Sequence, residues 1–145
     1  MRTTDDAVQR AGRGLIRMAW RDPGVAVAAV AELEGEPFPY PLHETLLRYI
    51  AQCGEEHRIP RDEEILESLG EEAAAELSRT LIEEIVGQEE DFTTLLRTIR
   101  LAQLRTAFEE HRLRADEMER KGNSDFLQEL QKSQRIKQKI DELRN

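Results

Sequence analysis

Apolar residues in the first 90 positions recur at intervals of three and four, a spacing that predicts short amphipathic helices. Capping residues, prolines and glycines mark where each helix begins and ends. The predicted helices cover residues 4–20, 23–33, 42–54, 62–70 and 71–87. No run of alternating apolar and polar residues is long enough to predict a strand. The front part of the chain is therefore expected to be a helical bundle.

Each of these helices has an apolar face that we expect to be buried. The faces consist, in chain order, of Val8, Ala11, Leu15, Ala19 and Trp20; Val27, Val30 and Ala31; Leu46, Leu47, Tyr49 and Ile50; Ile65, Leu66 and Leu69; and Ala74, Leu77, Leu81, Ile82 and Ile85. Residues 35–41 contain three prolines and cannot be helical, because proline lacks an amide hydrogen and restricts its predecessor. Phe38 and Tyr40 are expected to pin this loop to the core. Gly35 can end the preceding helix in the left-handed conformation.

A single long helix is predicted over residues 91–121, where neither proline nor glycine occurs. At about 1.5 Å per residue it would extend for roughly 45 Å. Its apolar stripe changes face along the helix. The first stripe consists of Phe92, Leu95, Leu96, Ile99 and Ala102, and the second of Leu101, Leu104, Phe108, His111, Ala115 and Met118. The first stripe is expected to lie on the bundle and the second on something else.

The chain is expected to fold back at Gly122 into an antiparallel helical hairpin. Asn123 or Ser124 can cap the final helix. Counted from the turn, the apolar positions of this helix lie at nearly the same distances as those of the long helix. The matched pairs of this hairpin seam are Met118 with Phe126, Ala115 with Leu130, His111 with Ser133, Phe108 with Ile136, Leu104 with Ile140, and Leu101 with Leu143. His111 and Ser133 would form one polar layer in the seam.

These elements predict an all-α protein with two subdomains. Residues 1–100 would form the helical bundle and residues 101–145 the C-terminal hairpin, joined by the continuous helix of about residues 91–121. Two helices alone bury little apolar surface, so the hairpin is expected to need either the bundle or a partner.

Composition favours a protein that contacts other proteins rather than nucleic acid or membranes. The chain has 145 residues, 39% of them hydrophobic, and its net charge of −9 opposes binding to phosphate backbones. Residues 1–90 carry 9 basic and 20 acidic side chains, a net of −11, whereas residues 91–145 carry 12 and 10, a net of +2. Neither an apolar signal segment nor an 18-residue apolar run occurs, so a cytoplasmic protein is expected.

The reactive residues form no recognisable catalytic or metal-binding motif, and we expect no cofactor. His43 and Glu44 lack the second histidine of the zinc-protease spacing and are expected at the surface, as is His57 in its polar turn. Gly12 and Gly14 lack the third glycine of a nucleotide-binding fingerprint. Helix packing or chance is the default interpretation of these two glycines.

The remaining candidates also have ordinary structural interpretations. Cys53 has no cysteine partner in the chain and is expected to be a small core residue. His111 is expected to pack in the seam, with a pH switch as the alternative. Acidic clusters at residues 62–64, 71–72, 83–84 and 89–91 suit helix starts or exposed turns. The basic series Lys132, Arg135, Lys137, Lys139 and Arg144 either flanks the hairpin in solvent or faces an acidic partner.

An ordered set of helical patterns in this chain resembles a known family. Residues 15–33 (LIRMAWRDPGVAVAAVAEL), Phe38 with residues 46–50, and residues 126–143 (FLQELQKSQRIKQKIDEL) after a long helix resemble the C-terminal, helicase-binding domain of bacterial DnaG-type DNA primases. The resemblance covers essentially the whole chain. It implies a helical bundle, a long connecting helix and a terminal hairpin that docks on the N-terminal domain of the hexameric DnaB-type replicative helicase.

The resemblance also implies a function without catalysis in this chain. The domain would modulate the helicase during lagging-strand priming at the replisome, and the zinc-binding and polymerase regions of a primase would lie upstream in a longer protein. Other replisome proteins could contact the bundle. Exposed residues proposed for the helicase contact are Leu113, Leu127, Arg135, Lys137 and Lys139. We expect a monomer that does not bind nucleic acid directly; the alternatives are a self-associating helical domain and, least favoured, an enzyme.

Overall fold

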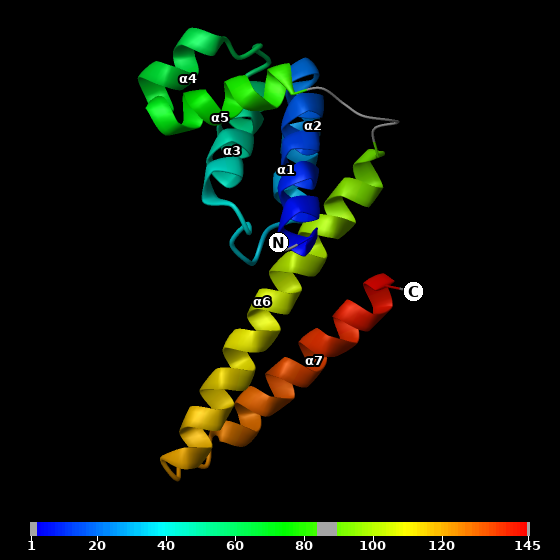
Figure 1. Cartoon of the computed structure of the whole chain (residues 1–145), viewed down its shortest axis with the longest axis vertical. Coiled ribbons are helices and arrows are strands. Elements are labelled where there is room, and N and C mark those ends of the chain that lie inside the picture. Colours follow the sequence, from blue (N-terminus) through cyan, green and yellow to red (C-terminus); the bar gives the residue numbers. More distant parts are fainter. Residues whose placement is uncertain (1–2, 84–89, 145) are drawn as a thin grey trace. The chain divides into compact units, whose positions relative to one another are not determined.

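Helices form all the regular structure in the residues described by the computed structural model (Figure 1). The described residues are 3–83 and 90–144, with side chains described from residue 7 onward. They contain α1 (Thr3–Arg21), α2 (Pro23–Glu32), α3 (Pro41–Glu55), α4 (Asp62–Leu69), α5 (Glu71–Ile82), α6 (Phe92–Arg120) and α7 (Phe126–Arg144), and no strand. The prediction of an all-α protein is confirmed.

The chain divides into two compact units, residues 1–99 and residues 100–145, and α6 runs continuously through the boundary. In the first unit α1, α2 and α3 pack against one another, while α5 packs against α1, α3 and α4. No helix among the described residues is both long enough and apolar enough to cross a membrane.

Several helix boundaries are set by the capping residues that predicted them. Asp22 accepts a hydrogen bond from the Gly24 amide at 3.1 Å, and Pro23 occupies the first turn of α2. Gly35 and Gly70 have φ angles of 106° and 98°, conformations that favour glycine. The predicted fifth helix is shorter in the structure, since α5 ends at Ile82. Its expected residues Ile85 and Gly87 lie outside the described residues.

The end of α3 differs from the prediction, because Gly54 lies inside the helix. His57 takes the left-handed conformation instead, with φ of 55°. Its amide donates to the Gly54 carbonyl and the Arg58 amide to the Cys53 carbonyl, a Schellman motif. Gly54 lies where α3 meets the start of α2, and a Cβ there would come within 2.9 Å of the Pro23 carbonyl oxygen. This glycine therefore serves close helix packing rather than termination.

The core of the first unit largely follows the predicted faces of α1 and α3. Its fully buried large side chains in these two helices are Leu15, Ile16, Leu46, Leu47, Ile50 and Cys53. Phe38 is buried and holds the proline-rich loop as predicted. In α4 only Ile65 is buried, whereas Leu66 is 53% exposed.

α2 buries a different face from the predicted one. Ala26 and Ala29 are fully buried, Val27 and Val30 are half-buried, and Ala31 is exposed. Of the ten residues of α2, all but Glu32 are uncharged. No polar side chains therefore distinguish the buried face. Periodicity carries little information in such a segment.

α5 also departs from the prediction, because its buried face includes polar residues. Ala73, Glu76, Leu77 and Thr80 are buried, whereas Ile82 is 81% exposed. The predicted residues Ala74 and Leu81 are half-buried. Glu76 and Thr80 thus occupy positions that an apolar pattern alone cannot identify.

Replacing Gly54 with alanine should destabilise the first unit by about 1–3 kcal/mol, because the added methyl meets backbone rather than a movable side chain. Gly14→Ala is the matched control, since a Cβ there meets only the flexible end of Leu95. We expect the control to change the free energy of unfolding by less than about 1 kcal/mol. Urea unfolding of both variants measures the difference, and equal stabilities would contradict the packing role.

Candidate functional site

The second unit consists of the later part of α6 and all of α7, joined by a tight turn (Figure 1). Gly122 has φ of 75°, and the amides of Gly122 and Asn123 donate to the carbonyls of Glu119 and Met118. The Asn123 side chain accepts a hydrogen bond from the Asp125 amide at 2.9 Å. A Schellman motif followed by an Asx turn therefore reverses the chain.

None of the twelve residues predicted for the hairpin seam is fully exposed to solvent. Leu104, Ala115, Ser133 and Ile140 are buried, and the half-buried members are Leu101, Phe108, His111, Met118, Phe126, Leu130, Ile136 and Leu143. Sequence reasoning missed three further buried residues, Gln103, Ala107 and Glu129. Ala107 follows Leu104 at the helical spacing of three and could have been included. The polar residues Gln103 and Glu129 carry no such signal.

The polar layer of the hairpin differs from the predicted pairing of His111 with Ser133. His111 Nδ1 lies 2.6 Å from Glu129 Oε2, one helical turn before Ser133. The Ser133 hydroxyl donates instead to the Leu130 carbonyl of its own helix at 2.8 Å. This bond from His111 lowers the pKa of Glu129 despite its burial, and Lys132 adds to the effect. A carboxylate, rather than a hydroxyl, is the partner of His111 in the hairpin.

The five residues predicted to bind a partner all lie on the surface. Leu113 and Leu127 are 56% and 57% exposed, and Arg135, Lys137 and Lys139 are also exposed. They do not share one face, because Leu113 lies about 200° around α6 from the seam residue His111. Successive residues of an α-helix are rotated by about 100°, so Arg135 and Lys137 also lie on opposite sides of Ile136 around α7.

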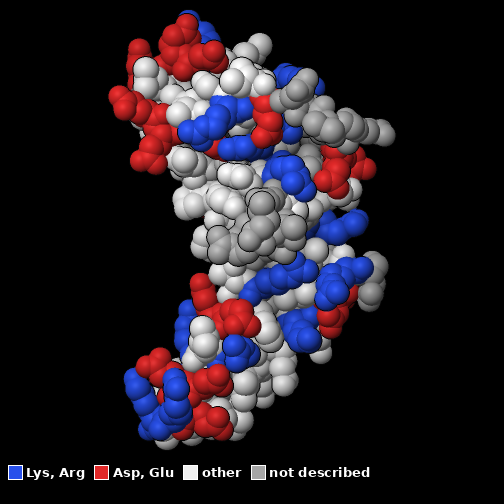
Figure 2. All heavy atoms as spheres, viewed as in Figure 1, with Lys and Arg blue, Asp and Glu red and all other residues white. Residues whose placement is uncertain are grey.

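Charges are paired near the turn of the hairpin, where Figure 2 shows acidic and basic side chains intermixed. Arg112 pairs with Glu109 at 2.9 Å, and Lys121 pairs with Glu117 at 3.0 Å. For Arg135, Lys137 and Lys139, no ion pair occurs with any described residue. These three cations of α7 are therefore available to an acidic partner, whereas Lys132 of the same helix pairs with Glu129 at 3.4 Å.

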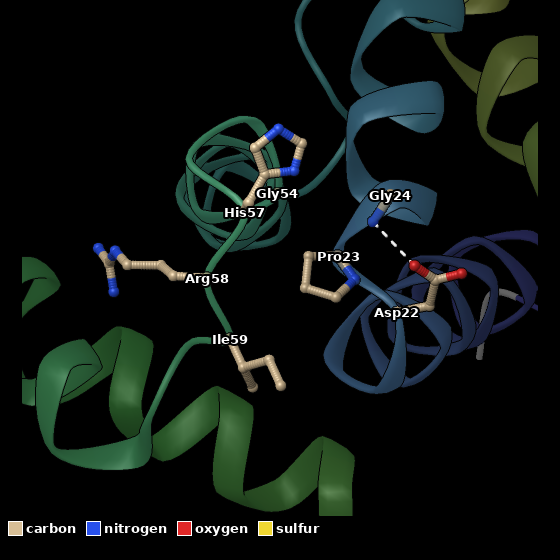
Figure 3. Close-up of a pocket in the computed structure, with 7 residues that line it drawn as sticks. All are labelled: Asp22, Pro23, Gly24, Gly54, His57, Arg58 and Ile59. Atoms are coloured by element: carbon tan, nitrogen blue, oxygen red, sulfur yellow. Dashed lines mark hydrogen bonds between the residues drawn. The ribbon is translucent and has the colours of Figure 1, made fainter.

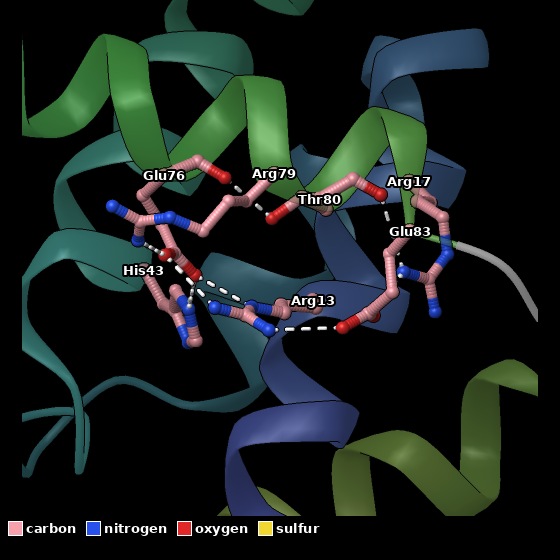
Figure 4. A network of polar contacts seen from close by, with 7 residues as sticks. All are labelled: Arg13, Arg17, His43, Glu76, Arg79, Thr80 and Glu83. Atoms are coloured by element: carbon pink, nitrogen blue, oxygen red, sulfur yellow. Dashed lines mark hydrogen bonds and ion pairs between the residues drawn. The ribbon is translucent and has the colours of Figure 1, made fainter.

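A second concentration of polar side chains lies inside the first unit (Figure 4). His43 was expected at the surface, but its side chain is only 3% exposed. The prediction was wrong because α1 comes very close to the start of α3: a Cβ on Gly12 would lie 2.3 Å from His43 Nδ1. Of the two interpretations offered for Gly12, helix packing and chance, the structure supports helix packing.

Glu76 of α5 is the centre of this buried charge network. Arg13 donates to both Glu76 carboxylate oxygens, at 2.8 and 3.1 Å, and His43 Nε2 lies 2.7 Å from Oε2. Arg79 also donates to Oε1. Arg13 donates in addition to Glu83, at 2.9 Å. One carboxylate therefore links α1, α3 and α5.

Arg17 extends the buried charge network along α1. It donates to Glu83 at 3.0 Å and to the Thr80 carbonyl at 3.3 Å. The Thr80 hydroxyl in turn donates to the Glu76 carbonyl at 2.8 Å. The network thus covers two turns of α5.

The pKa values of the two central groups, Glu76 and His43, are both lowered, but for different reasons. Burial raises the pKa of Glu76, but hydrogen bonds from Arg13 and His43 outweigh it and lower the pKa from 4.5 to about 2. Burial lowers the pKa of His43 against the opposing effect of Glu76, and the charge of Arg13 lowers it further. Glu76 is ionised and His43 neutral at pH 7.

A pocket of about 300 Å³ lies between the start of α2 and the loop after α3 (Figure 3). It is lined by Asp22, Pro23, Gly24, Gly54, His57, Arg58 and Ile59. The Asp22 carboxylate caps α2, and Arg58 pairs with Glu56 and Glu64 at 3.0 and 2.7 Å. The two charged side chains that line the pocket, Asp22 and Arg58, are therefore already bonded to other groups of the protein.

The other candidates keep their structural interpretations. Cys53 is buried, and burial raises the pKa of its thiol, which disfavours the reactive thiolate. His57 is exposed as predicted. Within the described ranges, no three His, Cys, Asp or Glu side chains are placed to hold a metal ion together. Figure 2 shows acidic side chains gathered over α4 and α5, whose first turns carry the predicted acidic clusters.

Comparisons of the chain with known protein families, curated proteins and solved structures gave no match.

Leu104→Ala should destabilise the hairpin by about 2–4 kcal/mol, because it leaves a cavity at a buried position. Leu113→Ala makes the same chemical change at an exposed position of the same helix and should cost less than about 0.5 kcal/mol. Hydrogen exchange of α7 amides in urea measures both effects. Equal losses would show that the seam is placed incorrectly.

Glu76→Gln should destabilise the first unit by about 3–5 kcal/mol, because Arg13 would lose its buried carboxylate. The interactions that lower the pKa of Glu76 to about 2 stabilise the fold fully above pH 4.5. This stabilisation is lost as pH falls towards 2, where the carboxylate takes up a proton. The variant should therefore lose less stability than the wild type between those pH values. Glu72→Gln, at an exposed position of α5, is the control and should behave as wild type. Parallel acid-unfolding curves for Glu76→Gln and wild type would contradict the assignment.

Proposed function

We propose that this chain is a non-catalytic interaction domain of a bacterial DNA primase, which docks on the N-terminal domain of a DnaB-type replicative helicase. The proposal is based on the resemblance of residues 15–33, 46–50 and 126–143 to the C-terminal domain of DnaG-type primases. The two compact units, with α6 continuous between them, are compatible with the bundle and hairpin that this resemblance implies.

The observation that carries docking is the solvent-facing surface of the hairpin. Leu113 and Leu127 are more than half exposed, although large apolar side chains gain free energy from burial. Arg135, Lys137 and Lys139 are exposed and form no ion pair with a described residue. Exposed apolar side chains can supply binding energy, and unpaired cations elsewhere on the hairpin select an acidic partner and speed association. This combination supports a protein partner with apolar pockets and acidic rims.

Self-association of the hairpin is the second candidate, and the exposed leucines support it as well. Leu113 and Leu127 could be covered by the same residues of another copy. The cations argue against it, because pairing identical α7 surfaces would bring like charges together. A monomer that binds the helicase is therefore the preferred proposal.

Titration of the whole chain into the isolated N-terminal domain of the helicase from the same organism tests the proposal. Calorimetry should detect saturable binding, and light scattering should find the chain alone to be a monomer. A folded, monomeric chain that produces no binding signal would refute docking. A stable dimer without helicase binding would instead establish self-association.

Changing Arg135, Lys137 and Lys139 together to Glu should slow association with the helicase by about tenfold at low salt, because it reverses the charge that steers the encounter. The effect should shrink as salt screens the surface. Stopped-flow kinetics measures the rate, and circular dichroism checks that helix content is unchanged.

A matched control makes the same change in total charge on the first unit. Arg10, Arg21 and Arg61 are exposed there, and their replacement by Glu should leave the association rate within about twofold of wild type. Equal slowing by both triple changes would show that only net charge matters. A wild-type rate for the α7 variant would make the apolar residues Leu113 and Leu127 the dominant contacts.

A further inference from the structure

α5 is held in the first unit through a partly polar interface. Its buried face consists of Ala73, Glu76, Leu77 and Thr80. Half of these positions therefore present polar groups where a core helix would normally present apolar ones. Buried ions lose their hydration, and their mutual attraction offsets that loss only while the geometry of every bond is maintained. The attachment of α5 thus depends on the charge state of a few side chains.

His43 makes this attachment sensitive to protonation. Its Nε2 atom donates to the Glu76 carboxylate at 2.7 Å, which requires the hydrogen to be on Nε2 when the ring is neutral. Its Nδ1 atom is buried against Gly12 and has no hydrogen-bond partner among the described groups. A second proton would therefore be placed on Nδ1, where no described acceptor receives it.

The charges around His43 also oppose a second proton. With His43 neutral, Arg13 from α1 and Arg79 from α5 face one carboxylate, Glu76, and the outer pair of Arg17 and Glu83 balances. The network then has a net charge of +1, which becomes +2 when the imidazole is protonated. The ring of Tyr40, from the loop before α3, lies 5.4 Å from the imidazole and supplies no negative charge at neutral pH.

Gly70 provides a point about which α5 can move. It is the single residue between α4 and α5, and its φ of 98° and ψ of 178° are restricted almost entirely to glycine. The start of α4 is attached to α3 separately, because Tyr49 donates to Glu64 at 2.6 Å. Arg58 also donates to Glu64, at 2.7 Å. Rotation at Gly70 can therefore displace α5 while α4 stays anchored.

We propose that α5 opens from α1 and α3 about Gly70 when His43 takes up a proton. The opening is an acid-sensitive conformational device of the first unit and is independent of the proposed helicase docking. In the open form the imidazole is hydrated and has a pKa near the ordinary value of about 6.5, whereas burial lowers the pKa of His43 in the closed form. Proton uptake therefore favours opening as pH falls below about 6.5.

Hydrogen exchange of the whole chain, followed by mass spectrometry between pH 7.5 and 5.5, tests the proposal. After correction for intrinsic exchange rates, protection of the α5 amides should fall about tenfold more than protection of the α3 amides, as expected for uptake of one proton. Carboxylates contribute little in this range, because their ordinary pKa values lie near 4. Loss of protection in α3 and α5 to the same extent would overturn the proposal.

Two histidine variants separate His43 from other titrating groups. His43→Gln retains an amide donor near the position of Nε2 but does not titrate, so its α5 protection should no longer depend on pH. His57→Gln is the control in the same unit, since His57 is exposed on the turn after α3, and it should keep the tenfold change. A tenfold change in His43→Gln, or its loss in His57→Gln, would refute the role of His43.

A measurement on the wild type covers the case in which His43→Gln does not fold. Nuclear magnetic resonance should show the His43 imidazole becoming protonated with the same midpoint as the loss of the closed-form signals of the α5 amides. Different midpoints would overturn the proposal, because opening and protonation would then be separate events.

Discussion

The carboxylate of Glu76 is the interaction on which the packing of the first unit depends. It accepts hydrogen bonds from Arg13 of α1 and His43 of α3, two helices far from α5 in the sequence. Burying a charge is unfavourable unless several donors replace its lost water, and the described donors around this carboxylate meet that condition. Gly12 belongs to the same arrangement, because any larger residue would displace His43. The identities of Arg13, His43 and Gly12 are thus all coupled to one buried charge.

Most of the helices could be predicted because their ends are fixed locally. Asp22 with Pro23 begins α2, and Gly70 ends α4, in each case through backbone preferences that do not depend on the rest of the fold. Gly54 shows the limit of such reasoning, since a glycine can end a helix or admit a neighbouring helix, and only the tertiary structure distinguishes these roles. His57 could not be expected to take the left-handed position, which non-glycine residues seldom adopt.

The candidate sites were harder to predict, because apolar periodicity does not identify polar residues that will be buried. Glu76 and His43 are separated by 33 positions and look like exposed residues until α3 and α5 are brought together. The hairpin shows the same limit over a shorter separation. Its apolar seam follows from distances to the turn at Gly122, yet Glu129, which is not part of the predicted seam, is the buried partner of His111. A charge is buried only where a specific complementary group is present, and such pairs follow no helical repeat.

The two histidine–carboxylate pairs differ in what surrounds them, because one is buried and the other is partly open to solvent. In the first unit, Arg13 and Arg79 already neutralise Glu76, and the imidazole is almost fully enclosed. A proton there has neither water nor an unshared anion to stabilise it. In the hairpin, the His111 side chain is 22% exposed and bonds directly to Glu129 at 2.6 Å. The hairpin pair therefore keeps contact with solvent, whereas the pair in the first unit depends on neighbouring protein groups alone.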